Sequence, residues 1–357
     1  NTSSGSERRI AWYCAIIGVS VGADICAEFG EPEPGGKGEV STSAPSPGIT
    51  AWNHGDEQMR LAGKRPGSED LPVTSIPARD VSPLLYESHC HTPLCKHAYG
   101  TPEEFASVAL ERNFKGITFT CHCPLPDGNS SHVRMSPEQY PEYLDLIASA
   151  RAAYEGKLDV RTGIESDYFP GVEPWLEKLH ARAPLSHILG SVHYQLKDYR
   201  KIYFKNDVLA YQRLYYEHLA MSAETGLFDT LAHPDLIKNE SPSEWDFARL
   251  RDDVCRSLDR IAATGVAMEL NTSGKLKNIA EMNPSLPQLI LMRERGIPVV
   301  IGADAHLAER VGDGYREALE LLLKAGYSEI SYFIDRKRQS VPISEALASL
   351  ALEPVGR

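Results

Sequence analysis

Seven short runs with the hydrophobic and polar pattern of β-strands are spread between about residues 84 and 306. Helical signals alternate with these runs, which is typical of a parallel α/β architecture. The runs are Leu84–His91, Gly116–His122, Asp159–Asp167, His187–His193, Thr230–Asp235, Ala267–Ser273 and Pro298–His306. The pattern therefore predicts parallel strands surrounded by helices.

Helix-capping signals fall between these strands. The segment Thr101–Glu104 has the composition of a capping box with proline at the first helical position, which predicts a helix to about Asn113. A second helix is expected from Ser136 to about Tyr154. Further helices are predicted at about Asp207–Thr225, Ser243–Ala263, Ser285–Arg295 and Tyr315–Ala325, the last two followed by glycines.

Each predicted strand ends on or just before a histidine or a carboxylate, except the sixth, which ends on the amide of Asn271. The C-terminal ends of the strands of a parallel barrel meet at one mouth, so these side chains are expected to face a common site. His89 and His91 are two residues apart, and alternate residues of a strand share a face. Both imidazoles can therefore reach one cation, and the same spacing separates Asp304 from His306.

Imidazole and carboxylate ligands together suit Zn²⁺, Mn²⁺ or Fe²⁺ better than Mg²⁺ or Ca²⁺, which prefer oxygen ligands. A single histidine is about as often an ordinary core or surface residue as a ligand. Here seven of the twelve histidines lie at or just after strand ends: His89, His91, His97, His122, His193, His233 and His306. Taken together they predict a metal site.

The ordered motifs HCHT, CKHA, GIESDYFPG, LGSVH, LAHPDL, ELNTSG and GADAH resemble those of the polymerase and histidinol phosphatase (PHP) superfamily. They are most similar to its bacterial histidinol-phosphatase branch, from about Leu84 to about Ala346. The resemblance implies an α/β fold, a distorted (β/α)₇ TIM-like barrel, with two to three divalent metal ions. It also implies nine ligands: His89, His91, His97, His122, Glu165, His193, His233, Asp304 and His306.

The resemblance further implies how these ligands are shared. One ion would be held by His89, His91, Glu165 and Asp304, a second by Glu165, His193 and His233, and a third by His97, His122 and His306. Glu165 is suited to bridge two ions because a carboxylate has two oxygens, and a water between them is acidified toward hydroxide. No serine or cysteine nucleophile is then required, and Glu165, Asp304 and His233 are the expected catalytic residues.

The implied activity is metal-dependent hydrolysis of a small phosphomonoester, most specifically of L-histidinol phosphate to L-histidinol and phosphate by a metal-bridging hydroxide. Lys238 and Arg134 are expected to bind the phosphate oxygens. The loops Cys123–Pro137 and Tyr194–Asp207 are expected to meet the leaving group, and their aspartates, Asp127, Asp198 and Asp207, would favour a cationic one.

Two alternatives remain open at the level of sequence. Another phosphoesterase of the same superfamily would act on nucleotides or on small sugar or polyol phosphates. A noncatalytic metal-binding module is the second, but it would be expected to lack some of the ligands.

The composition of the chain indicates which partners and which cellular compartment to expect. A net charge of −12 and a pI near 5.5 argue against nucleic-acid binding, which requires clustered Lys and Arg. The chain has seven cysteines, an odd number, and none of them form a C-x-x-C pair.

Three cysteines, Cys90, Cys121 and Cys123, flank the histidines and are expected to pack against helices rather than bind metal. Free thiols beside a metal site favour a cytoplasmic location. The sequence indicates no oligomeric state.

The two ends of the chain are not expected to be part of the barrel. Residues 1–83 are expected to be a largely disordered extension, because Glu31–Ser46 and Gly63–Pro77 are rich in Gly, Pro, Ser and charge and lack periodicity. The apolar run Ile10–Gly22 is faintly like a signal peptide but is too short to span a bilayer, so no membrane partner is expected. Residues 84–346 would form the barrel and 347–357 a tail.

Overall fold

The computed structural model describes residues 82–350, except for the side chain of Asp127. The predicted N-terminal extension and signal-like run, and the greater part of the predicted tail, lie outside these residues. Between residues 82 and 350, none of the helices has both the length and the apolar character that a membrane span requires.

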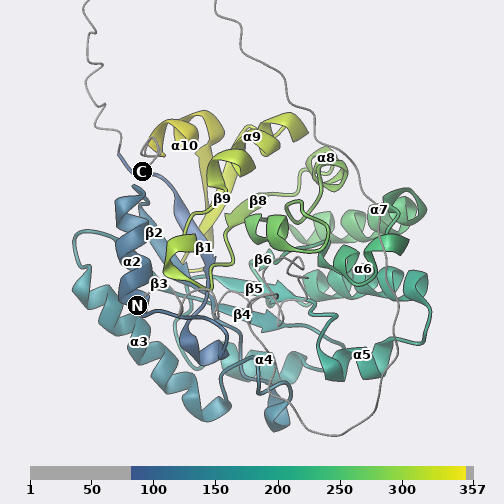
Figure 1. The fold of residues 1–357 in the computed structure, drawn as a ribbon, viewed down its shortest axis with the longest axis horizontal. Coiled ribbons are helices and arrows are strands. Elements are labelled where there is room, and N and C mark those ends of the chain that lie inside the picture. The colour runs from purple at the N-terminus through teal and green to yellow at the C-terminus, as the bar shows by residue number, and fades with distance from the viewer. Residues whose placement is uncertain (1–81, 351–357) are drawn as a thin grey trace, which may run out of the picture. The chain divides into compact units, whose positions relative to one another are not determined.

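Parallel strands lie in the middle of the described region, and helices lie around them (Figure 1). One sheet has the order β1-β2-β3 and the other the order β10-β9-β8-β7-β6-β5-β4. All neighbouring pairs are parallel except β9 with β10. The strands are β1 (Tyr86–Cys90), β2 (Gly116–Phe119), β3 (Asp159–Thr162), β4 (Ile164–Asp167), β5 (Ile188–Ser191), β6 (Thr230–Leu231), β7 (Ala267–Asn271), β8 (Val299–Gly302), β9 (Glu329–Ile334) and β10 (Lys337–Pro342).

The third predicted strand is divided at Gly163, where the chain passes from one sheet to the other. β3 pairs with β2, and β4 pairs with β5. A Cβ atom at Gly163 would lie 2.5 Å from the backbone oxygen of His187, so only glycine allows this close approach.

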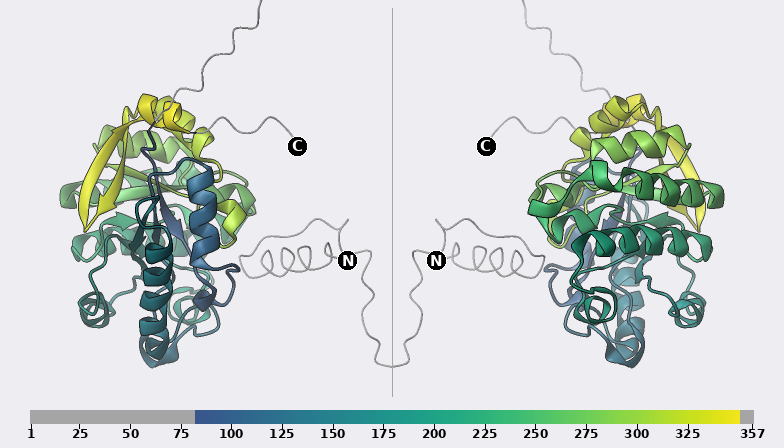
Figure 2. Two further views of the ribbon diagram at one scale, coloured as in Figure 1. Left: turned by 90° about the vertical axis from the view of Figure 1, so that its left-hand side faces the viewer. Right: turned by 90° about the vertical axis from the view of Figure 1, so that its right-hand side faces the viewer.

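Isolated parallel bridges join the two sheets at both edges. One links His122 to Glu165, and the other links Cys90 to Ala305. The strands β1 to β8 therefore follow one another in a distorted ring, in the order of the seven predicted runs, although regular pairing is interrupted at these two places. The β9–β10 hairpin extends β8 at the outer edge of the fold and was not predicted (Figure 2).

The six predicted helices are present, and residues 82–350 contain three further α-helices. The capping box forms as expected, with Thr101 N donating to the Glu104 carboxylate at 2.7 Å. The short helices α4, α5 and α10 were not predicted, and none of them has a side-chain N-cap to mark its start. The helices are α2 (Pro102–Glu111), α3 (Tyr140–Ala153), α4 (Glu173–His180), α5 (Lys197–Tyr203), α6 (Val208–Glu224), α7 (Phe247–Thr264), α8 (Leu286–Glu294), α9 (Tyr315–Ala325) and α10 (Ile343–Ser349).

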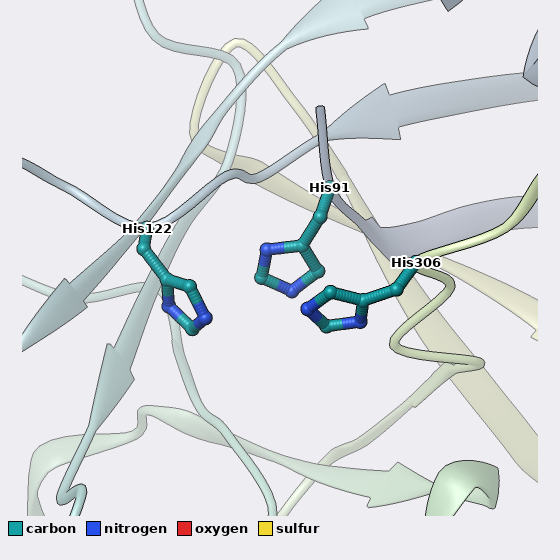
Figure 3. A group of neighbouring side chains, drawn as sticks. All are labelled: His91, His122 and His306. Atoms are coloured by element: carbon teal, nitrogen blue, oxygen red, sulfur yellow. The ribbon is translucent and has the colours of Figure 1, made fainter. Parts of the chain in front are cut away.

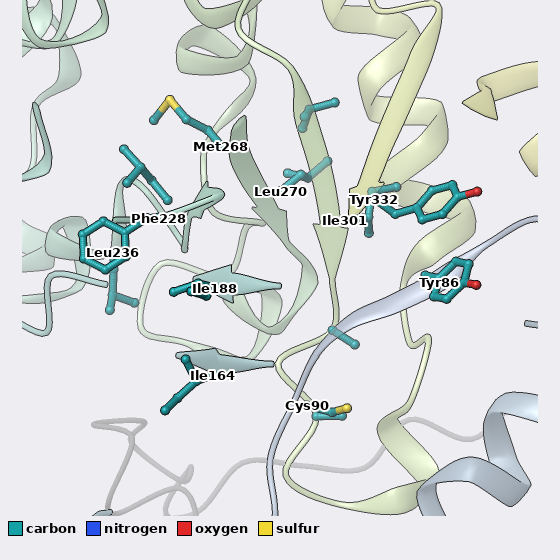
Figure 4. Close-up of a cluster of buried hydrophobic side chains, with 14 of the residues drawn as sticks. Tyr86, Cys90, Ile164, Ile188, Phe228, Leu236, Met268, Leu270, Ile301 and Tyr332 are labelled. Carbon is teal, nitrogen blue, oxygen red and sulfur yellow. The ribbon is translucent and has the colours of Figure 1, made fainter. Parts of the chain in front are cut away.

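Apolar side chains of the strands form the buried core shown in Figure 4, including Ile164, Ile188 and Met268. Tyr86 of β1 stacks on Tyr332 of β9 with ring centroids 4.6 Å apart. Each buried aliphatic side chain contributes about 1.5–3 kcal/mol relative to exposure. Because side chains alternate along a strand, the neighbours of the core-facing residues point to the opposite face, where the polar side chains gather.

Candidate metal centre

The nine side chains predicted as ligands form one connected cluster at the C-terminal ends of the strands. Figure 3 shows three of them converging, with His91 between His122 and His306. The His91 ring centroid lies 3.9 Å from that of His306 and 4.4 Å from that of His122. Carboxylate contacts connect these rings to the others: His91 to Asp304 at 3.0 Å, and His89, His122, His193 and His233 to Glu165.

Glu165 lies at the centre of the cluster, and its two oxygens face different imidazoles. Oε1 is 3.0 Å from His233 Nε2 and 3.4 Å from His193 Nε2. Oε2 is 2.7 Å from His122 Nδ1 and 3.5 Å from His89 Nε2. Burial raises the pKa of Glu165, but His122, His193 and His89 outweigh it and hold the pKa well below its usual range. Glu165 is therefore an ionised carboxylate placed between two sets of histidines.

His97 and His306 present ring nitrogens to each other. His97 Nδ1 donates to the Cys95 carbonyl at 2.7 Å, and His306 Nδ1 donates to the Asp304 carbonyl at 3.0 Å, since a carbonyl can only accept. In the neutral rings both Nε2 atoms then carry lone pairs, and these atoms are 3.0 Å apart. Burial, with His122 and His91 nearby, lowers the pKa of His97 to about 3, so a shared proton is disfavoured.

This geometry fits a metal ion. Two imidazole nitrogens bound to one zinc at about 2.0–2.1 Å lie roughly 2.8–3.4 Å apart in octahedral to tetrahedral geometry. The fully buried atoms His89 Nε2 and Glu165 Oε2 also make no hydrogen bond within the described part of the chain. The two atoms lie 3.5 Å apart without hydrogen-bond geometry, so a bound cation would give both of them a better partner.

Glu269 orients two of the predicted ligands and was not identified from the sequence. Its Oε1 lies 2.7 Å from His89 Nδ1, and its Oε2 accepts from the His233 backbone N–H at 2.8 Å. A Cβ atom at Gly302 would lie 2.2 Å from Glu269 Oε1, so this contact needs glycine there. Glu269 lies inside a predicted strand rather than at its end, so it was not counted among the strand-end side chains. Its position two residues before Asn271 places both side chains on the same face of the strand, and this spacing could have identified it.

Arg134 and Asp167 orient His193 in the same manner. Asp167 Oδ1 lies 2.5 Å from His193 Nδ1, while Arg134 donates to Asp167 Oδ2 and to the Cys123 carbonyl. Burial lowers the pKa of His193, but Asp167 and Glu165 outweigh it and raise the pKa to about 10. Arg134 does line the cavity, yet its charge is paired with Asp167 rather than available only for phosphate.

Lys238 lies away from the site, contrary to its expected role in phosphate binding. Its ammonium donates to Asp235 Oδ2 at 3.1 Å, to Glu281 Oε1 at 3.1 Å and to the Met282 carbonyl at 2.9 Å. These three bonds use all of its donors, and its side chain is fully buried outside the cavity lining. The 3₁₀ helix Leu236–Asn239 causes this, because it turns Lys238 back toward Asp235.

His233 and Asp304 both adopt left-handed backbone conformations, with φ of 32° and 50°. Such conformations cost non-glycine residues about 1–3 kcal/mol and are concentrated at functional sites. The Asp304 carboxylate accepts from Ser273 Oγ at 3.0 Å and from Asn271 Nδ2 at 3.4 Å. Burial raises its pKa, but His89 and His91 outweigh it and hold the pKa well below the usual range.

The grouping of side chains by distance differs in several respects from the grouping that the resemblance implied, and His122 is the clearest case. The resemblance assigned His122 to one ion with His97 and His306. In the structure His122 belongs to two groups whose ligand atoms lie within 4.8 Å of one another. One group contains His91 and His306, and the other contains Glu165 and His193.

The cysteines beside the ligands are buried, and those in residues 82–350 are unpaired. Cys121 does more than pack against helices, because its sulfur and that of Cys95 lie within 4.8 Å of a His91 ring nitrogen. This contact places two thiols directly behind a predicted ligand.

A cavity of about 470 Å³ lies over the cluster. Its floor contains seven of the nine predicted ligands: His97, His122, Glu165, His193, His233, Asp304 and His306. The walls come from the two loops expected to meet the leaving group, through residues such as Val133 and Gln195, and from Lys277 and Asn278 after β7.

The PHP domain family model matches residues 87–273. A probable histidinol-phosphatase of Deinococcus radiodurans is 36% identical over 264 residues, which cover 71% of this chain and 98% of the relative. The histidinol-phosphatase of Bacillus subtilis is 29% identical over 267 residues, covering 66% of this chain and 98% of that protein.

A solved structure shares the fold. It is the histidinol phosphate phosphatase of Lactococcus lactis, crystallised with zinc, L-histidinol and phosphate. Its TM-score is 0.61 and its sequence identity 20%, with 71% of this chain and 98% of that chain covered.

Proposed function

The chain belongs to the PHP domain family, and we propose that it is a metal-dependent phosphomonoesterase with L-histidinol phosphate as its preferred substrate. The observation that carries this proposal is Glu165, one ionised carboxylate within 3.5 Å of four imidazoles at the floor of a cavity. The relatives named histidinol-phosphatase support the reaction, since one of them is 36% identical over nearly its whole length.

The nine predicted ligands would hold the ions, and Glu165 would serve two ions. Bound divalent ions would polarise the phosphoryl oxygens and lower the pKa of a water between them. The chain's own contribution is to fix the ligands: Glu269 holds His89, Asp167 holds His193, and Ser273 holds Asp304. Such outer contacts set the ring orientation and tautomer of metal-binding histidines. We propose Zn²⁺, Mn²⁺ or Fe²⁺ as the ions, because the donor set mixes nitrogen with carboxylate oxygen.

A second, smaller cavity supports the preference for L-histidinol phosphate. It has a volume of about 80 Å³ and shares His193 and Leu196 with the main cavity. Its other walls come partly from the two loops expected to meet the leaving group, which supply Tyr199, Tyr203 and the carboxylate of Asp198. The end of β4 and the residues after it supply Asp167, Tyr168 and Phe169. Aromatic faces and the carboxylates of Asp167 and Asp198 suit an imidazole ring and a nearby cation. The volume is far below the roughly 300–1,000 Å³ of pockets for larger ligands, which disfavours a nucleoside.

We further propose that the protein acts in the cytoplasm, because the thiols of Cys95 and Cys121 are unpaired beside His91. Unpaired neighbouring thiols persist where the compartment is reducing.

Phosphate release tests the proposal directly. The purified full chain, supplied in turn with Zn²⁺, Mn²⁺ or Fe²⁺, should hydrolyse L-histidinol phosphate with a higher kcat/KM than glycerol phosphate or AMP. Asp198→Asn should reduce that preference, whereas Asp252→Asn on the exposed face of α7 should not. Equal efficiency on the three substrates would keep the phosphatase but reject this substrate, and no phosphate release from any of them would reject both.

A further inference from the structure

We propose that Lys277 binds the non-reacting oxygens of the substrate phosphate. This inference rests on the proposed phosphatase function and names a cation that neither the sequence motifs nor the relatives indicated. The need for such a cation is physical, because a phosphomonoester carries close to two negative charges at neutral pH.

Lys277 is the cation that the structure places best. It lines the 470 Å³ cavity together with Glu165, His193, His233, Asp304 and His306. Its side chain is half-buried, and within residues 82–350 its ammonium has no hydrogen-bonding or ion-pair partner. An ammonium offers three donors and a compact charge, which suits phosphate oxygens.

The charges around Lys277 support the same role. Burial lowers the pKa of its ammonium, and Asp304 and Glu165 act in the opposite direction. Its strongest electrostatic partners are thus the two carboxylates of the metal centre, although neither lies within ion-pair distance. A phosphate bound between the metal centre and Lys277 would place its negative charge next to both the metal ions and the ammonium.

The backbone of Lys277 is held in place, so its side chain does not have to be ordered from a free loop. It follows the 3₁₀ helix Thr272–Leu276, and its N–H donates to the Gly274 carbonyl at 3.0 Å. Two residues later, Ile279 N–H donates to Asn239 Oδ1 at 2.9 Å, which ties the segment to the loop after His233. Asn239 itself is buried and lines the cavity.

The other basic residues are less suitable. Arg134 is paired with Asp167, and Lys238 is enclosed by Asp235 and Glu281 outside the cavity. Lys197 lines the cavity but is exposed at the start of α5, where water screens its charge.

The test compares Lys277→Gln and Lys277→Arg with a control, Lys275→Gln. Lys275 lies two residues away but is exposed and contacts Glu317 at 3.4 Å, outside the cavity. Binding of inorganic phosphate to the metal-loaded full chain is measured by calorimetry, metal content by elemental analysis, and kcat and KM with L-histidinol phosphate.

Lys277→Gln should weaken phosphate binding by about 10-fold to 100-fold, as expected for loss of a charged hydrogen bond, with unchanged metal content. Lys277→Arg should restore part of the affinity, and Lys275→Gln should bind phosphate as the wild type does. Unchanged phosphate affinity in Lys277→Gln would overturn the inference, and so would a parallel loss of metal, which would make Lys277 a support of the metal centre. Because phosphate binding is measured without turnover, it tests Lys277 even if L-histidinol phosphate is not hydrolysed.

Discussion

His97 Nε2 and His306 Nε2 lie 3.0 Å apart, although the two residues are 209 positions apart in the sequence. Each ring uses its other nitrogen to donate to a carbonyl, so the facing atoms are lone pairs in the neutral rings. Two lone pairs at this distance repel unless a cation lies between them. The fold therefore brings together two ring nitrogens whose close approach a shared cation would stabilise.

Removing the metal should destabilise the protein. Chelation with EDTA would leave the His97–His306 pair and the buried Glu165 without a cation, so the melting temperature should fall and activity should be lost. Zn²⁺ or Mn²⁺ should restore both, and Mg²⁺ should restore them poorly, because it prefers all-oxygen ligands. Scanning calorimetry before and after chelation measures the effect, and an unchanged melting temperature would contradict it.

Glu165→Gln should lower both the metal content and the rate. An amide keeps the shape but has one acceptor oxygen and no charge, so it no longer serves two sets of histidines. We expect kcat to fall by more than about 100-fold, beyond the roughly 10–100-fold typical of losing an outer contact to a ligand. Circular dichroism should remain native. Glu177→Gln on the exposed face of α4 is the matched control, and wild-type turnover in Glu165→Gln would reject the shared-carboxylate site.

Glu269→Gln should weaken the metal centre without removing a ligand. Its Oε1 holds His89 Nδ1, and its Oε2 holds the backbone of His233, so the amide can keep only one of these contacts. Metal affinity or kcat/KM should drop by about 10–100-fold. Titration of the apoprotein with zinc measures the first quantity. If zinc affinity does not change, Glu269 has no role in orienting the ligands.

Deleting residues 1–80 should leave the metal content and the rate unchanged. The nine predicted ligands, the lining of the cavity and the described core are supplied by residues 82–350. The truncated chain and the full chain are compared by elemental analysis and by phosphate release. An unfolded truncated chain would show that the extension is part of the folded domain.

Acid should destabilise the fold partly through His187, which lies outside the predicted ligands. Burial lowers the pKa of His187 to about 3, and its ring stacks on Phe333. Because the folded pKa lies below the unfolded value near 6.5, the unfolded state binds the proton more tightly, and stability is lost as pH falls from about 6.5 toward 3. One such proton corresponds to about 1.4 kcal/mol per pH unit.

Urea unfolding at several pH values measures this dependence. His187→Phe should keep the stacking and reduce the slope of stability against pH in that range, whereas the exposed His132→Phe should not. An equal slope in His187→Phe and the wild type would contradict the assignment.

Local signals in the sequence were sufficient for the seven strand runs, the six longer helices between them and the set of strand-end side chains. Strand periodicity places His89 and His91 on one face, and the Thr101–Glu104 capping box marks the start of α2. The short helices α4 and α5 were not predicted, and they lack the side-chain cap that marks the start of α2. The resemblance added the ligand set, because it depends on the order of motifs rather than on any single one.

Tertiary structure decided which side chains contact one another. Glu269 is an isolated carboxylate in an apolar strand, and its contacts with His89 and His233 exist only because β7 lies between β6 and β8. Lys238 and Lys277 each follow a predicted strand that carries site residues. Lys238 is enclosed by carboxylates, whereas Lys277 lines the cavity. The direction of a side chain in a loop depends on contacts with segments distant in sequence. Sequence therefore determined which chemical groups are present, and packing determined which of them meet.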